Sequence, residues 1–522
     1  MRKLEKLQLV KNVSSNWVAL VVNVLVGIFL SPFILHRLGD TAFGIWVLIF
    51  SITGYYGLFD LGIRSSVVRY VSKAKATGDP DYASRVISTS LFAYSCIGIV
   101  TFLITLTLTA HVDAFFRIEP EFHTTARWLL FMVGSAVSLG FPLGISGGML
   151  EGLQRFDITS FTSIASALLR ALLIVIALQH GHGLLVVAFI TVILPILAST
   201  VAAMVAFRLL PIRLRWSRVD RETFREMAGY SAPMLIMIVS ARLRFKSDSV
   251  IIGAILSPAA ITYFNIGSRI VDYAGEVVES LAQTFVPMAS HAYSLGDVDR
   301  LRKIFVAGNR FCAFTIFPIC AILIILGRSV IEAWVGERYV AQSYPVLLIL
   351  LISTTLMLAQ AASGRVLMGM SRHGTWAIVM FIEGVVNIVL SVLLVRPYGI
   401  IGDAIGTAAP LAATMIFFLP WHVCRQLQIR MSLYLREAYL LPVMVCTPVV
   451  IGLLLMKQWF VPHNYLQLAA HLGVAGTVYG LALLWAFASK RAVKIGNLSS
   501  AEAMLEASAA AGVVVDNYSQ EI

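Results

Sequence analysis

Four charged residues lie inside an apolar stretch that is long enough to cross a membrane. The stretch runs from Ala228 to Leu256, and the charged residues follow one another in ARLRFKSD as Arg242, Arg244, Lys246 and Asp248. A charge at the centre of a lipid-exposed helix costs about 2.5–3.5 kcal/mol, whereas each large apolar residue returns only about 0.3–0.6 kcal/mol. Lipid therefore cannot surround these side chains. Either the segment does not span, or the side chains face a polar cavity that admits an anion.

The composition of the whole chain is that of an integral membrane protein. Of 522 residues, 58% are hydrophobic and only 13% are charged, and the mean hydropathy is +0.84. Soluble domains carry about 25% charged residues. The sequence holds about fourteen apolar runs of the roughly 17–25 residues that a spanning helix needs. It therefore predicts an all-α polytopic membrane protein with about 14 transmembrane helices.

The distribution of Lys and Arg predicts the orientation. With the amino terminus placed in the cytoplasm, cytoplasmic segments carry 26 basic residues and outer segments carry 7. Because cytoplasmic loops are enriched in Lys and Arg, both termini are predicted to be cytoplasmic. The net charge of +12 then follows from topology and requires no nucleic-acid partner. The first apolar run has no cleavage site after it, so we expect it to be retained as a helix.

The two halves of the chain repeat three loop sequences in the same order and at nearly the same offset. KATGDPDYASRVI at Gly78 recurs as YSLGDVDRLRKIF at Gly296, GGMLEGLQRFDITSF at Gly152 recurs as GRVLMGMSRHGTWAI at Gly369, and FLSPFI at Ser31 recurs as ILSPAA at Ser257. An even number of helices separates equivalent loops, so the copies are predicted to be related by a pseudo-twofold axis along the membrane normal. We predict six-helix lobes at 1–225 and 226–425, two additional transmembrane helices at 426–489, and a short cytoplasmic tail at 490–522.

Helical spacing divides the charged cluster into two faces. Arg242 and Lys246 share one face, while Arg244 and Asp248 share another and can pair. One interpretation is a structural ion-pair network between helices. The other is a cationic wall for an anionic group, because three cations to one anion leave a net positive charge. By the same spacing, Asp60 and Arg64 are predicted to form a local ion pair.

The next apolar segment carries a polar stripe on one face, at spacings of 3, 4, 3 and 4: Arg269, Asp272, Glu276, Glu279 and Gln283. At membrane depth such a stripe lines water or a partner helix. Asp272 or Glu276 is a candidate to bind a coupling proton or sodium ion. The alternative is that these carboxylates only balance nearby cations.

Arg170 and Glu383 lie at similar places in the two halves. Arg170 ends a stripe that includes Ser166, and under the offset of the repeat the equivalent positions in the second half are Glu383 and Asn387. Different polar residues in the two copies predict an asymmetric lumen, with Glu383 as a further candidate for ion coupling to H⁺ or Na⁺. Snorkelling to the membrane interface is the alternative for Arg170.

Sequence signatures of nucleotide-dependent or metal-dependent catalysis are absent. The chain has no Walker A sequence, no H-E-x-x-H and no C-x-x-C spacing. We therefore predict no catalytic residue, no metal site and no cofactor, and a protein that is not an enzyme.

Five stretches share a pattern of Gly, Pro and loop residues: LSPFILHRLGDTAFGIWVL, GLFDLGIRSSVVRYVSKAKATGD, EGLQRFD, GRVLMGMSRHG and LVRPYGIIGDAIGT. They resemble the polysaccharide-transporter flippases of the multidrug/oligosaccharidyl-lipid/polysaccharide exporter superfamily, and the similarity runs through about residues 10–425. The resemblance implies two lobes around a central cavity that opens alternately to each side. It implies transport of an undecaprenyl-pyrophosphate-linked glycan from the cytoplasmic to the outer leaflet, for O-antigen, capsule or exopolysaccharide synthesis.

The resemblance also implies cations in the cavity that meet the pyrophosphate. The matching candidates are Arg242, Arg244, Lys246, Arg269 and Arg170. The implied partners are the lipid-linked glycan, membrane lipids, a polysaccharide polymerase and chain-length machinery, and the implied location is the bacterial plasma (inner) membrane.

Two other functions are compatible with a polytopic chain of this kind. A multidrug extruder of the same superfamily would export cations, and its lumen would be dominated by carboxylates. A membrane glycosyltransferase or polysaccharide polymerase would carry large outer loops with Asp, Arg or His, whereas the predicted outer loops here are short.

Overall fold

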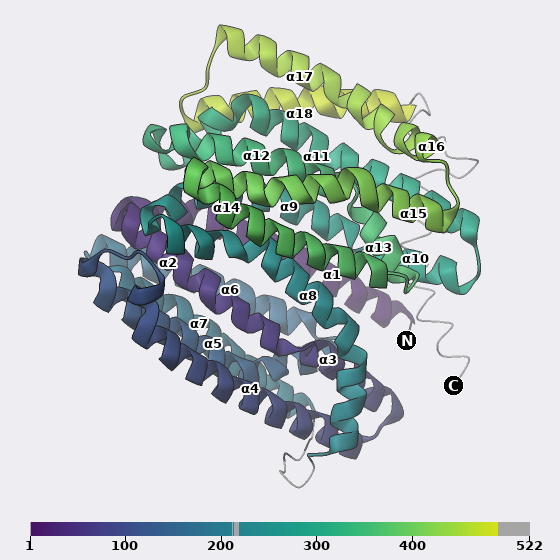
Figure 1. Ribbon diagram of the computed structural model, residues 1–522. Coiled ribbons are helices and arrows are strands. Elements are labelled where there is room, and N and C mark those ends of the chain that lie inside the picture. Colours follow the sequence, from purple (N-terminus) through teal and green to yellow (C-terminus); the bar gives the residue numbers. More distant parts are fainter. Residues whose placement is uncertain (1, 211, 213, 215–218, 489–522) are drawn as a thin grey trace. The chain divides into compact units, whose positions relative to one another are not determined.

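The computed structural model describes residues 2–210, 212, 214 and 219–488. All regular secondary structure among these residues is helical (Figure 1). Side chains are described for the same residues except 2–17, 226–238 and 245. The prediction of an all-α chain is confirmed. The predicted cytoplasmic tail at 490–522 lies outside the described residues.

The chain divides into two compact units, Met1–Thr262 and Tyr263–Ile522. The division follows packing, and it assigns the segment that carries the charged cluster to the first unit. The lobe boundaries drawn from the sequence repeat, at residues 225 and 425, stay predictions.

The first unit consists of long helices joined by short turns. Its elements are α1 (Arg2–Leu38), α2 (Asp40–Gly54), the 3₁₀ turn η1 (Tyr55–Asp60), α3 (Ile63–Thr77), α4 (Pro80–Phe115), η2 (Pro120–Phe122), α5 (His123–Gly152), α6 (Phe156–Gln179), α7 (Leu184–Leu209) and α8 (Arg221–Ile255).

The second unit begins within α9 (Pro258–Ala282). Its further elements are α10 (Phe285–Ser294), α11 (Val298–Val335), η4 (Glu337–Tyr339), α12 (Val340–Ala359), α13 (Ala361–Gly369), α14 (Gly374–Ala413), the π-helical turn η5 (Thr414–Phe418), α15 (Leu419–Leu427), α16 (Met431–Leu435), the π-helical turn η6 (Arg436–Leu440), α17 (Leu441–Trp459) and α18 (Tyr465–Ala488).

Eleven helical stretches among the described residues are long and apolar enough to cross a membrane, which makes this a multi-pass membrane protein. One of them, Gly374–Leu427, has 54 residues and would extend about 80 Å at the α-helical rise, far beyond the roughly 30 Å of a bilayer core. It breaks at Gly399, where φ is 58° and ψ is −143°, so it has room for two crossings. The charged helices α8 and α9 are not among these eleven stretches. The total of about 14 transmembrane helices stays a prediction.

Local backbone geometry recurs at the spacing of the sequence repeat. Gly78 and Gly296 have φ of 65° and 67°, and each is followed by an aspartate that caps the next helix. Gln154 and Ser371 have φ of 60° and 54°, in the second pair of repeated loops. Because residues other than glycine rarely adopt positive φ, this recurrence supports a duplication.

Helix α8 packs within the first unit against α2, α3, α4 and η1. Its packed side includes the fully buried Ile252, and a β-carbon on Gly253 would lie only 3.0 Å from Cδ1 of Leu48 on α2. This close approach fixes the rotation of α8 about its axis. The rotation in turn decides which of its charged residues are buried.

Candidate functional site

The charged residues of α8 divide between two faces of the helix. Arg244 and Asp248 are buried, at 2% and 8% exposure, whereas Arg242 is half-buried and Lys246 is exposed. The division matches the two faces that helical spacing predicts. Arg242 and Lys246 are therefore accessible to a ligand in this structure, and Arg244 is not.

The guanidinium of Arg242 lies against the turn η1, at a place where that turn has no side chain. A β-carbon on Gly57 would be 3.0 Å from Nη2 of Arg242, and one on Gly54 would be 3.9 Å from Nη1. Tyr55, in the same turn, lies within electrostatic range of both Asp248 and Arg242. Gly57 thus makes room for the cation beside the backbone of η1, whereas Gly54 lies at an ordinary contact distance from it.

A second polar group joins η1 and α3 to α4 and α5. Tyr94 donates a hydrogen bond to Asp60, and Nη2 of Arg64 lies 2.5 Å from Oε1 of Glu151. Among the described side chains Arg64 therefore pairs with Glu151 and not with Asp60, so the predicted local ion pair is wrong. The true partners lie 34 and 87 residues away along the chain, and spacing within one helix could not indicate them.

Arg170 lies apart from the α8 cluster. It is half-buried on α6, which packs mainly against α1 and α7, whereas α8 packs against α2, α3 and α4. The described residues provide Arg170 with no charged partner. The contacts within this unit do not bring Arg170 together with Arg242.

Helix α9 presents the predicted polar stripe as an accessible face of the second unit. Nη1 of Arg269 lies 3.9 Å from Oδ2 of Asp272, whose side chain is 51% exposed, and Glu276 is half-buried. Glu279 pairs with Arg365 of α13. Arg269 within the stripe and Arg365 on α13 thus balance part of its negative charge. Asp272 and Glu276 remain accessible.

Two carboxylates are buried on the two halves of α14. Glu383, 4% exposed, precedes the break at Gly399, and Asp403, 0% exposed, follows it. The sequence repeat indicates Glu383 as a candidate, whereas Asp403 is not among the residues predicted from the sequence. A single carboxylate in the apolar run that begins at Ile400 is a signal that could have found it, because ionisable residues at membrane depth are usually functional.

Hydroxyl and amide groups connect the two halves of α14 close in sequence to these carboxylates. Nδ2 of Asn387 donates to Oγ1 of Thr407 over 3.1 Å, and Oγ of Ser391 donates to the backbone oxygen of Asp403 over 3.3 Å. A β-carbon on Gly406 would lie 2.4 Å from Oγ of Ser391, so the glycine permits this close approach. Oxygen ligands suit a small hard cation, and a buried carboxylate suits a proton.

The described part of the chain therefore places different chemistry in its two units. The first unit exposes cations on α8, at Arg242 and Lys246. The second unit carries carboxylates on α9 and α14, and Arg269 belongs to this group and not to the α8 cluster. Among the described residues, no group of three or more His, Cys, Asp or Glu side chains is placed to hold a metal ion.

Known proteins match this chain over most of its length. The model of a family described as polysaccharide biosynthesis protein matches residues 9–292. The chain is 21% identical over 409 residues to the putative O-antigen transporter of Shigella flexneri, a match that covers 76% of this chain and 94% of that relative.

Solved structures share the arrangement of helices. The lipid II flippase MurJ, in an inward closed conformation, matches 89% of this chain and 97% of its own with a TM-score of 0.69 and 14% identity. An inward-facing multidrug resistance MATE family transporter of the MOP superfamily matches 78% of this chain and 94% of its own with a TM-score of 0.65 and 14% identity. At this level of identity the likeness concerns the fold alone.

Proposed function

Because this chain belongs to the polysaccharide biosynthesis protein family, we propose that it moves a lipid-linked polysaccharide precursor across a membrane without changing it chemically. The family expected from the sequence is confirmed. The matches to a putative O-antigen transporter and to the fold of a lipid II flippase support a transport function.

The proposed substrate is a polyprenyl-pyrophosphate-linked oligosaccharide, carried from the cytoplasmic to the outer leaflet for O-antigen, capsule or exopolysaccharide synthesis. The observation that carries this proposal is the pair of accessible cations on α8, Arg242 and Lys246, within a membrane protein. A pyrophosphate that leaves water needs charged donors, and a hydrogen bond between charged groups contributes about 1.5–3 kcal/mol.

The cations differ in the roles that we assign to them. Arg242, held beside η1, and Lys246 contact the pyrophosphate, while the buried Arg244 raises the local positive potential. Arg269 and Arg170 are proposed to contact the substrate at another stage of its passage, since each is half-buried and neither belongs to the α8 cluster. The glycan occupies water and the polyprenyl chain stays in lipid.

Transport is proposed to proceed by alternating access, with the pathway open to one side of the membrane at a time. The driving ion, H⁺ or Na⁺, is proposed to bind at Glu383 together with Asp403, because both are buried and the polar groups one helical turn after each of them, Asn387 and Thr407, bond to each other. Asp272 and Glu276 on α9 are the second candidates, since they are more accessible and are partly balanced by Arg269.

The protein is proposed to lie in the bacterial inner membrane with both termini in the cytoplasm. Reporter fusions after Lys73 and Arg215 should then report cytoplasm, and fusions near Glu119 and Glu337 the outside. A polysaccharide polymerase and chain-length machinery are the proposed partners.

A multidrug extruder is the second candidate, and the carboxylates of α9 and α14 are the observation that favours it. The accessible cations of α8 oppose it, because they would repel a cationic drug. A membrane glycosyltransferase or polymerase is the third candidate. The turns between the described helices are short and leave no room for a large outer catalytic loop, which argues against this third candidate.

Reconstitution tests the proposal directly. Purified full-length protein is placed in vesicles with a synthetic polyprenyl-pyrophosphate-linked oligosaccharide, and a membrane-impermeant lectin measures how fast the glycan changes leaflet. We expect faster exchange than in protein-free vesicles and no uptake of organic cations. Cation uptake without glycan exchange would instead identify the extruder.

A further inference from the structure

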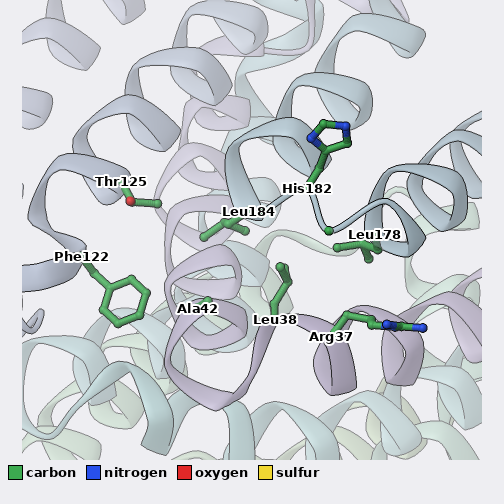
Figure 2. A pocket seen from close by; sticks show the side chains of 10 residues that line it. Arg37, Leu38, Ala42, Phe122, Thr125, Leu178, His182 and Leu184 are labelled. Atoms are coloured by element: carbon green, nitrogen blue, oxygen red, sulfur yellow. The ribbon is translucent and has the colours of Figure 1, made fainter.

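We propose that one end of the first unit, the end predicted to face the outside, binds the phosphate group of an anionic phospholipid. A cavity of about 420 Å³ opens there among helix ends (Figure 2). It is lined by the last residues of α1, the start of α2, the η2–α5 junction and the loop between α6 and α7. The volume falls within the roughly 300–1,000 Å³ of small-molecule sites.

The polar side chains that line the cavity are hydrogen-bond donors suited to a phosphate. They are Arg37, His182 and Thr125, and no carboxylate is among the lining residues. Figure 2 shows Arg37 and His182 on one side of the cavity with Leu178 between them, and Phe122 and Thr125 on the other side. A guanidinium presents a planar fork that matches phosphate oxygens.

Arg37 is available for such a ligand. Its side chain is exposed, and its Cζ lies 5.7 Å from the centre of the Phe33 ring, a contact that leaves the N–H groups of the guanidinium open. Among the described residues it forms no ion pair with a carboxylate. Gly183 and Leu184, at the start of α7, also line the cavity, and Gly183 provides no side-chain cap for the first amides of that helix.

The remaining lining is apolar, and this favours a lipid over a free anion. Leu38, Ala42, Phe122, Leu178 and Leu184 contribute to it. A phospholipid offers the matching combination of an anionic phosphate with glycerol and the first methylene groups. The cavity lies at helix ends, where spanning helices reach the head-group region, so a phospholipid of the outer leaflet can enter it from the bilayer.

The test measures lipid binding and does not depend on the transport proposed above. Delipidated full-length protein in detergent is titrated with a short-chain phosphatidylglycerol, and bound lipid is counted by native mass spectrometry. We expect Arg37→Gln to weaken phosphatidylglycerol binding about threefold or more, and Arg37→Lys to weaken it less, because lysine keeps the charge but loses the fork. Phosphatidylcholine should bind more weakly than phosphatidylglycerol to the unsubstituted protein.

Arg328 provides a matched control for Arg37. It is also exposed, is also predicted to lie at the outer side, and also has its guanidinium over an aromatic ring, 5.2 Å from the centre of Tyr344. Arg328→Gln should leave phosphatidylglycerol binding unchanged. Equal weakening by both substitutions would overturn the proposal. It would also be overturned if inorganic phosphate displaced the lipid at a concentration equal to that of the lipid, since the apolar lining would then contribute nothing to binding.

Discussion

Helices α8 and α9 follow each other in the chain, yet their polar faces have opposite charge. Helix α8 carries three cations and one carboxylate within the short run ARLRFKSD, whereas the stripe of α9 carries one cation and three carboxylates. On α8, the accessible cation Arg242 lies beside Gly57 of η1 and Gly54, the last residue of α2. On α9, the accessible groups are carboxylates, and Arg269 and Arg365 pair with two of them.

The difference indicates a division of tasks between the two units. A cationic face attracts an anion, and a carboxylate face attracts a proton or metal cation. A transporter that moves an anionic head group and is driven by a cation needs both. The comparison therefore predicts that substitutions of the α8 cations change substrate handling, whereas substitutions of the carboxylates of α9 and α14 change coupling to the ion.

The largest effect is expected from neutralising the accessible cations of α8. Arg242→Ala and Lys246→Ala should each lower transport about tenfold or more, the effect of losing a charged contact of about 1.5–3 kcal/mol. Arg242→Lys should retain more activity than Arg242→Ala, because it keeps the charge. The measurement is glycan exchange in vesicles together with restoration of surface polysaccharide, each divided by protein abundance.

Arg225 is the control for this substitution, because it is exposed near the start of the same helix and outside the apolar stretch. Arg225→Ala should leave transport unchanged. If Arg242→Ala lowered protein abundance while each remaining molecule transported normally, α8 would hold a structural ion-pair network and the contrast between the two units would lose its functional meaning.

A smaller, qualitatively different effect is expected in the second unit. Glu383→Gln and Asp403→Asn should lower transport several-fold under an imposed ion gradient and remove its dependence on that gradient. Without a gradient these variants should match the unsubstituted protein. Asp272→Asn and Glu276→Gln should change transport less, because these side chains are more accessible and Arg269 balances them.

Vesicles with defined proton and sodium gradients provide the measurement for the second unit. Arg365→Gln serves as a comparison, because it removes the α13 cation that pairs with Glu279 of the stripe and changes no residue of α14. If transport by all four carboxylate variants still depended on the ion gradient, these groups would only balance charge.

A moderate effect is expected from crowding the Arg242 guanidinium. A β-carbon on Gly57 would be 3.0 Å from Nη2, so Gly57→Ala should displace the guanidinium by a few tenths of an ångström. We expect transport to fall about two- to fivefold, because displacing a charged donor weakens its hydrogen bond without removing the charge. Gly54→Ala is the matched control, since its β-carbon would be at an ordinary 3.9 Å from Nη1. Equal activity of the two variants would show that the position of the guanidinium beside η1 does not matter.

The smallest effect is expected at the start of α8, on stability. Asp220 accepts hydrogen bonds from the hydroxyl and amide of Thr223 and from the amide of Glu222, and these bonds hold the pKa of its carboxyl below the ordinary value. Asp220→Ala should lower the melting temperature by roughly one to two degrees, since a helix cap is lost. Asp220→Asn should lower the melting temperature less than Asp220→Ala does, because asparagine also caps helices.

The pH dependence of this effect has a definite sign. A carboxyl with a lowered pKa in the folded state stabilises the fold above its unfolded-state pKa, and the stabilisation disappears as the pH falls through the folded-state value. The difference in melting temperature between the unsubstituted protein and Asp220→Ala should therefore be constant near neutral pH, begin to shrink below about pH 4, and vanish only below the lowered folded-state pKa. If the difference in melting temperature persisted in acid, the charge of the Asp220 carboxylate would not be what stabilises the helix.

Much of the fold and part of the site could be predicted from the sequence. Apolar runs identified most membrane helices, and helical spacing placed Arg242 and Lys246 on a different face from Arg244 and Asp248, because both depend on periodicity along one helix. The same reasoning failed for Asp60 and Arg64. Each bonds to a residue on another helix, and spacing along one helix carries no information about such partners.

The sequence by itself determined that this chain crosses a membrane many times, repeats a helical pattern and carries charge where lipid cannot accept it. Only the tertiary structure decided that Arg242 lies beside Gly57. It also decided that the two halves of α14, which carry Glu383 and Asp403, pack against each other. The physical reason is that hydrophobic length and periodicity are local properties, whereas burial and hydrogen bonding of a polar group depend on which distant segments pack against it.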